Sequence, residues 1–318
     1  MWDSNDYYKD KGKNELYLKY FYICSKDNPV HTIDSEGKFC YSYISRNHVD
    51  EIINPISIKI DQYGLKLFCG FSKYFTIFDL VNDKQIAKIE PIQEENYTKD
   101  PSKISCFDFN HRNNFYLVGS YSGKIYLIDY LTNRTIFTIS EKHKKGVNNL
   151  KFFNKSENSL NFISGGRFDN EIFIWDSRNL SSPVYSLFRE NQTHQKLNFV
   201  IDEGDNYIYV ANNDGSILVY DLKNLSSVSY FYTNENMTNM REAVSCVDFD
   251  SNKNLLVTAS GARQFENKNS SVNKKDEKNF ACDDFPYLEL EEENSFDYNS
   301  EREFKIWDFS KLYRPEYL

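Results

Sequence analysis

Histidine, cysteine and serine are the residue types that most often ligate metals or attack substrates, and this chain places none of them at a useful spacing. Its five histidines never cluster as metal ligands do. Its six cysteines form no Cys-x-x-Cys pair and lie mostly in apolar runs, as reduced core thiols do. The nucleotide-binding glycine motifs and HExxH are absent, and Tyr121 stands where a nucleophile elbow needs serine. The sequence therefore predicts no metal, no cofactor, no small-molecule substrate and no enzyme activity.

Arginines and lysines in loops are the remaining candidates for chemistry, because they can bind phosphate. An arginine fork can also read a base edge with two hydrogen bonds. The net charge of -9 and pI near 5.2 argue against a surface that is basic throughout, so we expect a local basic face at most. No signal peptide and no apolar run of about 18 residues occurs, so the sequence predicts no membrane association.

The elements that must position these loops are short strands in a repeat. Six apolar runs end in aspartate, and the first five follow one another at intervals of about 45 to 50 residues, the period of a propeller blade. The terminal residues are Asp34, Asp79, Asp129, Asp176, Asp221 and Asp308, two of them preceded by tryptophan as Trp175-Asp176 and Trp307-Asp308. We expect these residues to be structural, with each aspartate in a turn.

Each run belongs to a set of four strands, clearest in the third unit at 104–109, 115–120, 124–129 and 135–140. The sequence thus predicts an all-β fold, a WD40-type β-propeller, as a single domain over 1–318. Six blades of an expected seven are recognisable, and we expect the N-terminal part to be missing. Residues 264–301 form a polar and acidic insertion in the last blade, expected to be disordered.

In a propeller, the loops from the second to the third strand of a blade and from one blade to the next gather on one face, where function usually lies. These loops hold the candidate cations: Lys26, Arg46, His48, Lys73, Lys103, Lys124, Lys142 to Lys145, Arg167, Arg189, Lys196, Arg241 and Arg263. Acidic residues lie among them, so solvated loop charge is the alternative interpretation.

Several segments resemble the telomerase Cajal body protein 1 family. They are KDNPVHTID (26–34), NHVDEI (47–52), LFCGFSKYFTIF (67–78), ISGGRFDNEIFIWDSRNLSSPVYSLFRE (163–190) and LLVTASGARQF (255–265). The similarity covers nearly the whole chain from about residue 20. The family's N-terminal extension and some of its propeller sequence have no counterpart here.

The resemblance implies an adaptor that binds H/ACA-type small Cajal body RNAs or telomerase RNA and escorts those ribonucleoproteins to nuclear bodies. Its candidate RNA-binding residues are His48, Arg167, Arg189 and Arg263; a structural role, such as pairing with Asp169, Glu190 or Asp50, is the alternative for them. Arg178 follows a third strand and is expected to hold the fold.

A protein-protein interaction scaffold without RNA binding is the second hypothesis. Splayed bases and phosphates of RNA loops suit a face with arginines and aromatic residues, which favours the first. We also expect slow folding of non-local strand pairs, with a chaperonin as a further partner, and a nuclear location with the cytoplasm as a second one.

Overall fold

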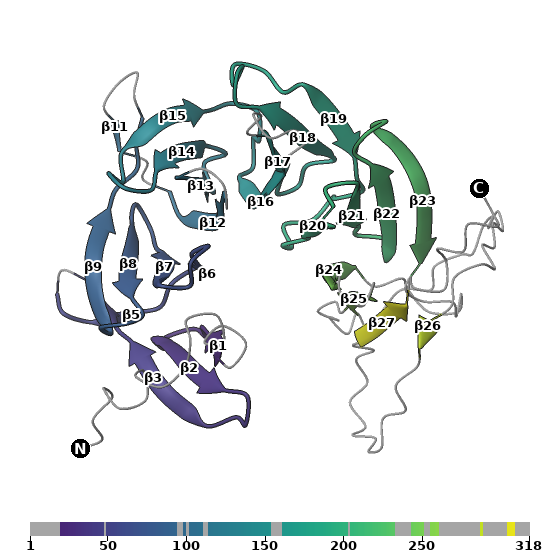
Figure 1. Ribbon diagram of the computed structural model, residues 1–318. Coiled ribbons are helices and arrows are strands. Elements are labelled where there is room, and N and C mark those ends of the chain that lie inside the picture. The colour runs from purple at the N-terminus through teal and green to yellow at the C-terminus, as the bar shows by residue number, and fades with distance from the viewer. Residues whose placement is uncertain are drawn as a thin grey trace, which may run out of the picture. The chain divides into compact units, whose positions relative to one another are not determined.

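The computed structural model describes residues 20–47, 49–93, 98–99, 102–110, 114–153, 161–202, 204–232, 243–250, 255–260, 287–288 and 304–308. Within these ranges every regular element is a β-strand (Figure 1). The chain divides into two compact units, Met1–Phe152 and Phe153–Leu318, which are described one at a time.

Unit 1 contains antiparallel sheets ordered β1-β2-β3, β6-β7-β8-β9 and β12-β13-β14-β15, and the short pairs β4-β5 and β10-β11. The strands are β1 (Tyr20–Ile23), β2 (Val30–Asp34), β3 (Phe39–Tyr43), β4 (Ser45–Arg46), β5 (Ile52–Ile53), β6 (Ser57–Ile60), β7 (Lys66–Gly70), β8 (Phe75–Asp79), β9 (Lys84–Ile89), β10 (Ile92–Gln93), β11 (Thr98–Lys99), β12 (Ile104–Phe109), β13 (Phe115–Ser120), β14 (Ile125–Asp129) and β15 (Thr135–Ile139).

The boundary between the units falls at the end of β16, the first strand of a sheet ordered β16-β17-β18-β19. Unit 2 continues with sheets ordered β20-β21-β22-β23 and β24-β25-β27-β26. The strands are β16 (Val147–Phe153), β17 (Asn161–Gly166), β18 (Glu171–Asp176), β19 (Tyr185–Phe188), β20 (Phe199–Ile201), β21 (Tyr207–Ala211), β22 (Ser216–Asp221), β23 (Ser226–Tyr232), β24 (Val244–Asp250), β25 (Leu255–Ser260), β26 (Tyr287–Leu288) and β27 (Phe304–Asp308).

The four strands of a sheet are called a, b, c and d in their order across the sheet, and the sheets repeat one another in detail. The pairing of c with d is interrupted by a bulge just before the aspartate that ends c. The bulges lie at Ile77/Phe78, Leu127/Ile128 and Val219/Tyr220. The residue four places after each aspartate has a positive φ: Asp83 at 53°, Asn133 at 54° and Leu225 at 55°.

The aspartate at the end of a c strand accepts hydrogen bonds from the turn that follows it. Oδ1 of Asp129, for example, accepts the backbone N–H of Leu131 at 3.1 Å and of Thr132 at 2.6 Å. The same kind of turn follows Asp34, Asp79, Asp176 and Asp221. The side chains of Trp307 and Asp308 lie outside the described residues.

Strands b and c are largely buried, as is the a strand β12, whereas the d strands β9, β15 and β19 are the more exposed ones. In unit 1, Phe68, Phe75 and Tyr116 form one aromatic cluster with Tyr126 and other residues of β12 to β14. Burial raises the pKa of the Tyr116 hydroxyl well above its ordinary value, and the nearby charge of Asp129 adds to that effect.

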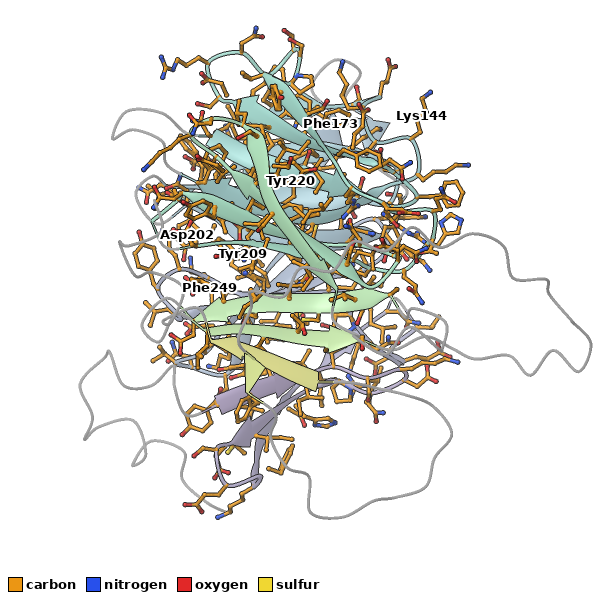
Figure 2. All side chains as sticks on the ribbon, turned by 90° about the vertical axis from the view of Figure 1, so that its right-hand side faces the viewer. Lys144, Phe173, Asp202, Tyr209, Tyr220 and Phe249 are labelled. Carbon is orange, nitrogen blue, oxygen red and sulfur yellow. The ribbon has the colours of Figure 1, made fainter. Side chains whose placement is uncertain are left out.

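The core of unit 2 follows the same pattern. Trp175 on β18 is buried, stacks on Phe162 with ring centroids 5.9 Å apart, and donates its indole N–H to Ser164 at 2.8 Å. Further along the chain, Tyr209 on β21 stacks on Phe249 on β24 at 5.1 Å, and Figure 2 shows these two rings close together. Aromatic stacking thus links one sheet of unit 2 to the next.

Most of the insertion over 264–301 lies outside the described residues. Within it, β26 pairs with β27, with Tyr287 opposite Trp307 and Leu288 opposite Ile306. The last sheet therefore takes its fourth strand from a chain segment that precedes its third.

Candidate RNA-binding loops

Two loops of unit 2 are joined by hydrogen bonds into one structure. They are the b-to-c loop at 167–170 and the d-to-a loop at 189–198, together called the paired loops. The N–H of Phe168 donates to the carbonyl oxygen of Thr193 at 3.1 Å, and the N–H of Arg189 donates to that of Asn170 at 2.8 Å. The N–H of Asn191 donates to the side-chain oxygen of Asn170 at 3.0 Å.

The guanidinium of Arg189 holds the paired loops together from inside. The side chain has no exposed surface. Its Nε donates to the carbonyl oxygen of Asp169 at 3.2 Å, its Nη1 to that of Leu197 at 3.3 Å, and its Nη2 to that of Gly166. Burial lowers the pKa of Arg189 to about 10, while the charge of Asp169 opposes that shift, so the guanidinium is protonated near neutral pH.

The burial of Arg189 contradicts the sequence-based prediction that this residue binds RNA. A guanidinium without exposed surface, whose donors are engaged by three carbonyl groups, has no group to offer to RNA. Arg189 therefore has a structural role. The sequence could place it in a loop, but its orientation depends on carbonyl groups that only the folded loops bring together.

Arg167 and Phe168 lie at the outer side of the paired loops. Arg167 is half-buried, and Phe168 is 50% exposed with a φ of 49°. The ring of Phe168 stacks on the exposed imidazole of His194, with centroids 5.3 Å apart and an interplanar angle of 29°. Lys196 is also exposed. The paired loops therefore combine aromatic and cationic side chains at the surface. Sequence reasoning missed Phe168 and His194, because nothing in the repeat indicates their contact.

Acidic residues lie nearby and limit the positive charge of the paired loops. Asp169 and Glu190 are partly buried, and Glu171 is exposed. Oδ1 of Asp169 accepts the N–H of Glu171 at 3.1 Å, and the N–H of Glu190 donates to the side-chain oxygen of Asn212 at 3.0 Å. These bonds attach the acidic residues to the loop backbone and to the next b-to-c loop.

In unit 1, the d-to-a loop between β15 and β16 exposes three lysines in a short space. Lys142, Lys144 and Lys145 are exposed, whereas His143 between them is buried. A side chain on Gly123, which has a φ of 86°, would collide with the carbonyl oxygen of His143. This close approach fixes the loop, so the lysines project from a defined backbone.

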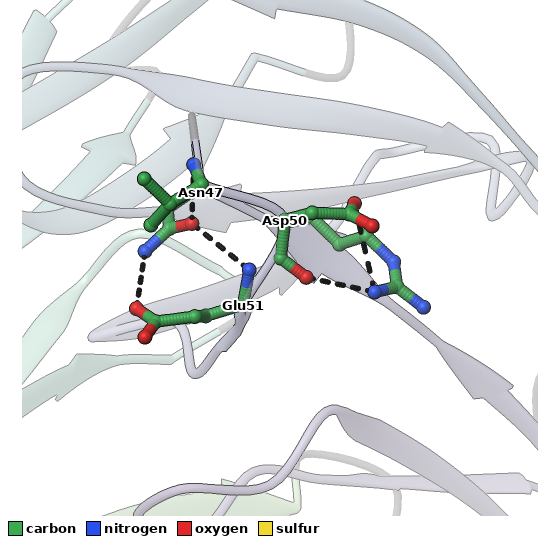
Figure 3. Close-up of polar contacts among 5 residues, drawn as sticks. Asn47, Asp50 and Glu51 are labelled. Atoms are coloured by element: carbon green, nitrogen blue, oxygen red, sulfur yellow. Dashed lines mark hydrogen bonds and ion pairs between the residues drawn. The ribbon is translucent and has the colours of Figure 1, made fainter.

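The segment NHVDEI in unit 1 forms the loop between β4 and β5 (Figure 3). The side-chain oxygen of Asn47 accepts the N–H of Glu51 at 3.0 Å, and its amide donates to the Glu51 carboxylate at 2.9 Å. Arg46, half exposed, donates to the carbonyl oxygen of Asp50 at 2.8 Å and lies 3.6 Å from its carboxylate. His48 itself lies outside the described residues.

The other sequence-predicted arginines differ in their surroundings. Arg178 is 68% exposed, with Nε 3.5 Å from the carboxylate of Asp176 in the turn after β18. Arg263 lies outside the described residues.

In the part of the chain that the structure describes, no group of three or more His, Cys, Asp or Glu side chains could hold a metal ion. Nor does any helix there have the length and apolar character to cross the bilayer.

Comparison with solved structures identifies the fold class of this protein. A chain in the crystal structure of the mitotic checkpoint complex matches with a TM-score of 0.61 and 18% identity, covering 77% of this chain and 70% of that one. Together with the four-stranded sheets and the aspartate-terminated c strands, this match defines an all-β protein of the WD40 β-propeller class, as the sequence predicted.

Comparison with curated proteins identifies the relatives. Telomerase Cajal body protein 1 of Bos taurus is 26% identical over 80% of this chain, and that of Homo sapiens is 25% identical over 76%. The Drosophila melanogaster homolog is 24% identical over 57%. The chain is thus similar to telomerase Cajal body protein 1 over most of its length, and the resemblance seen in the sequence is confirmed.

The extent of these matches is partial. The chain spans 46% of the Bos taurus protein, 43% of the human protein and 32% of the Drosophila melanogaster protein, less than half in each case. No protein-family model matches the chain.

Proposed function

We propose that this protein is a non-enzymatic WD40 adaptor that binds H/ACA-type small Cajal body RNA or telomerase RNA and escorts the ribonucleoprotein to nuclear bodies. The similarity to telomerase Cajal body protein 1 over most of this chain is the observation that carries the proposal. A nuclear location follows from the same role, with the cytoplasm as a second location and a chaperonin as a folding partner.

The surface loops are consistent with an RNA ligand. Exposed lysines project from the loop after β15 in unit 1, and Arg167, Lys196 and two exposed aromatic rings lie on the paired loops of unit 2. Single-stranded RNA is bound by cations that contact phosphates and by rings that stack on bases. The loops of each unit supply the cations, and the paired loops supply both kinds of group.

Among the candidate RNA contacts, Arg167 is the one that the structure describes at a partly exposed position. His48 and Arg263 remain sequence-based candidates. Arg178 serves as a natural comparison because it is an exposed arginine of unit 2 in a c-to-d turn.

A protein-protein scaffold is the second candidate function. Strand β19 and the residue before it expose three apolar side chains: Val184 by 62%, Tyr185 by 42% and Phe188 by 59%. An apolar strip of this kind suits a protein partner. The two functions predict different results when the molecules that copurify with the protein are treated with nuclease. A scaffold retains its protein partners, whereas an RNA adaptor loses the partners that are bound through RNA.

The test is crosslinking and sequencing of RNA bound to the tagged protein in its own cells. We expect enrichment of hairpin-hinge-hairpin RNAs or telomerase RNA, reduced by Arg167→Glu and unchanged by Arg178→Glu. The same charge reversal is made in both variants, so a loss confined to Arg167→Glu reports on the paired loops. RNA at background levels with the wild-type protein would refute the RNA function and favour the scaffold.

A further inference from the structure

Phe168 is held in a backbone conformation that its side chain disfavours. Its φ of 49° lies in the left-handed region, which bulky residues rarely occupy. The hydrogen bond from its N–H to Thr193 and the bonds of Arg189 on either side keep the loop in this shape. Such strain persists only where the surrounding structure enforces it, and it often accompanies a functional role.

The strained backbone presents the phenylalanine ring at the surface. Half of Phe168 is exposed although the ring already stacks on His194, and His194 is exposed as well. A ring that only filled the core would be buried. The pair therefore forms a small aromatic platform that is open to a flat ligand.

The neighbours of this platform are polar or charged, and they include the acidic Asp169 as well as two cations. Arg167 precedes Phe168, while Gln192 and Lys196 flank His194 and are exposed. An apolar side chain of a protein partner would need an apolar pocket around it, whereas a nucleobase needs a flat ring with cations near its phosphates. The composition of the paired loops favours a nucleobase.

We infer that Phe168 and His194 form a stacking platform for one unpaired base of the bound RNA, with Arg167 and Lys196 beside its phosphates. The inference rests on the proposed function and specifies its ligand contact: a base that is free to leave its own stack. Arg189 positions the platform from inside the loops and makes no contact with the RNA.

The test combines protein and RNA changes in one cycle. Binding of the full chain to a labelled RNA hairpin is measured at low salt, with an abasic nucleotide placed in turn at each unpaired position. Phe168→Asn removes the ring, and asparagine tolerates a positive φ, so this variant keeps the loop shape. Phe188→Ala removes another exposed phenylalanine of unit 2 and is the matched control.

We expect Phe168→Asn to weaken binding about tenfold, the usual effect of losing one base stack. At one RNA position, an abasic nucleotide should weaken wild-type binding as much as Phe168→Asn does. The same abasic RNA should bind the Phe168→Asn variant no more weakly than the intact RNA does. His194→Phe should retain affinity, His194→Ala should lose it, and Phe188→Ala should bind as wild type. An equal unfolding temperature for Phe168→Asn and wild type establishes that the loop remains folded.

Other outcomes separate the two hypotheses. If wild type binds the hairpin and Phe168→Asn binds equally well, the platform is refuted and the RNA function stands. If Phe168→Asn binds weakly but no abasic position is coupled to it, the ring does not stack on a base and the platform is again refuted. If wild type does not bind the hairpin, the RNA function fails and the platform fails with it.

Discussion

At the scale of single residues, the hydrogen bonds of buried polar side chains stabilise the fold of this protein. Arg189 supplies hydrogen-bond donors to the carbonyl oxygens of Gly166, Asp169 and Leu197. In unit 1, the hydroxyl of Tyr130 donates to the carboxylate of Asp61 at 2.6 Å, where both groups are buried. The loss of either residue leaves at least one buried acceptor without this donor, and the loss of Arg189 removes the donor of three carbonyl groups at once.

Replacement of Arg189 by leucine should destabilise the protein strongly. Three buried carbonyl groups would lose their donor, and we expect a loss of about 3 kcal/mol or more in the free energy of unfolding. Arg189→Lys should be intermediate, because an ammonium cannot reach all three oxygens. Urea unfolding followed by tryptophan fluorescence measures the effect. Arg178→Leu, at an exposed arginine, is the control and should change stability by less than about 0.5 kcal/mol.

The buried tyrosines of unit 1 should make the protein less stable at high pH. Burial raises the pKa of Tyr116, and burial together with the hydrogen bond to Asp61 raises that of Tyr130. Above about pH 10 the unfolded tyrosines lose protons that the folded ones keep, so stability falls as pH rises. Arg189, whose pKa is lowered to about 10, contributes in the opposite direction.

Urea midpoints measured between about pH 9 and 11 test this sign. We expect the midpoint of the wild type to fall, and Tyr130→Phe to show a smaller fall because one of the linked groups is removed. Tyr63→Phe, at a partly exposed tyrosine that packs on Tyr130, is the comparison. A midpoint that stays constant or rises with pH would contradict the assignment.

At the scale of elements, the turn after a c strand is the repeated unit of the fold. It combines a bulge, a terminal aspartate and a residue with positive φ, and the same combination recurs after β8, β14 and β22. The aspartate compensates turn N–H groups that have no strand partner. This explains why apolar runs of varied sequence all end in the same residue.

Asp221→Ala should destabilise the turn after β22 by about 1 kcal/mol. The Asp221 carboxylate accepts the N–H of Lys223 at 2.7 Å and the side-chain amide of Asn224 at 2.7 Å, and alanine accepts neither. Asp221→Asn retains an acceptor oxygen and should lose less. Thermal unfolding of the three proteins measures the order, and an alanine variant as stable as wild type would show that water replaces these bonds.

At the scale of the whole molecule, the proposed binding of RNA by basic loops must act against a net charge of -9. An acidic protein repels RNA at long range, so binding requires cations concentrated at the contact. The exposed lysines at positions 142, 144 and 145 provide such a concentration within one loop.

Replacing Lys142, Lys144 and Lys145 together by glutamine should weaken RNA binding and its salt dependence. Each lysine that neutralises a phosphate of single-stranded RNA contributes about 0.7 to the slope of log affinity against log salt, so a slope shallower by about 2 is expected. The matched control replaces Lys38, Lys84 and Lys223 by glutamine, three exposed lysines that lie in a c-to-d turn or, for Lys84, directly after one. An equal change in both triple variants would indicate a general charge effect.

Much of the fold could be predicted from the sequence because strand periodicity and turn residues are local signals. The runs expected at 104–109 and 115–120 match β12 and β13, and the run expected to end at Asp176 matches β18. The aspartates mark strand ends for the same reason: a short side chain that bonds its own turn needs no distant partner. A fourth strand from Tyr287–Leu288 was not foreseen, since it is short and its pairing with β27 is non-local.

The candidate site was predicted only in part. The sequence by itself determined the strand repeat, the WD40 class and the loops in which Arg167 and Arg189 lie. The tertiary structure alone decided that Arg189 is buried and that Phe168 meets His194, because both results depend on contacts between residues that are distant in the sequence, 20 residues apart for Arg189 and Asp169. Local propensity sets where a strand ends, whereas the direction of a loop side chain is set by the carbonyl groups and rings that the folded chain places around it.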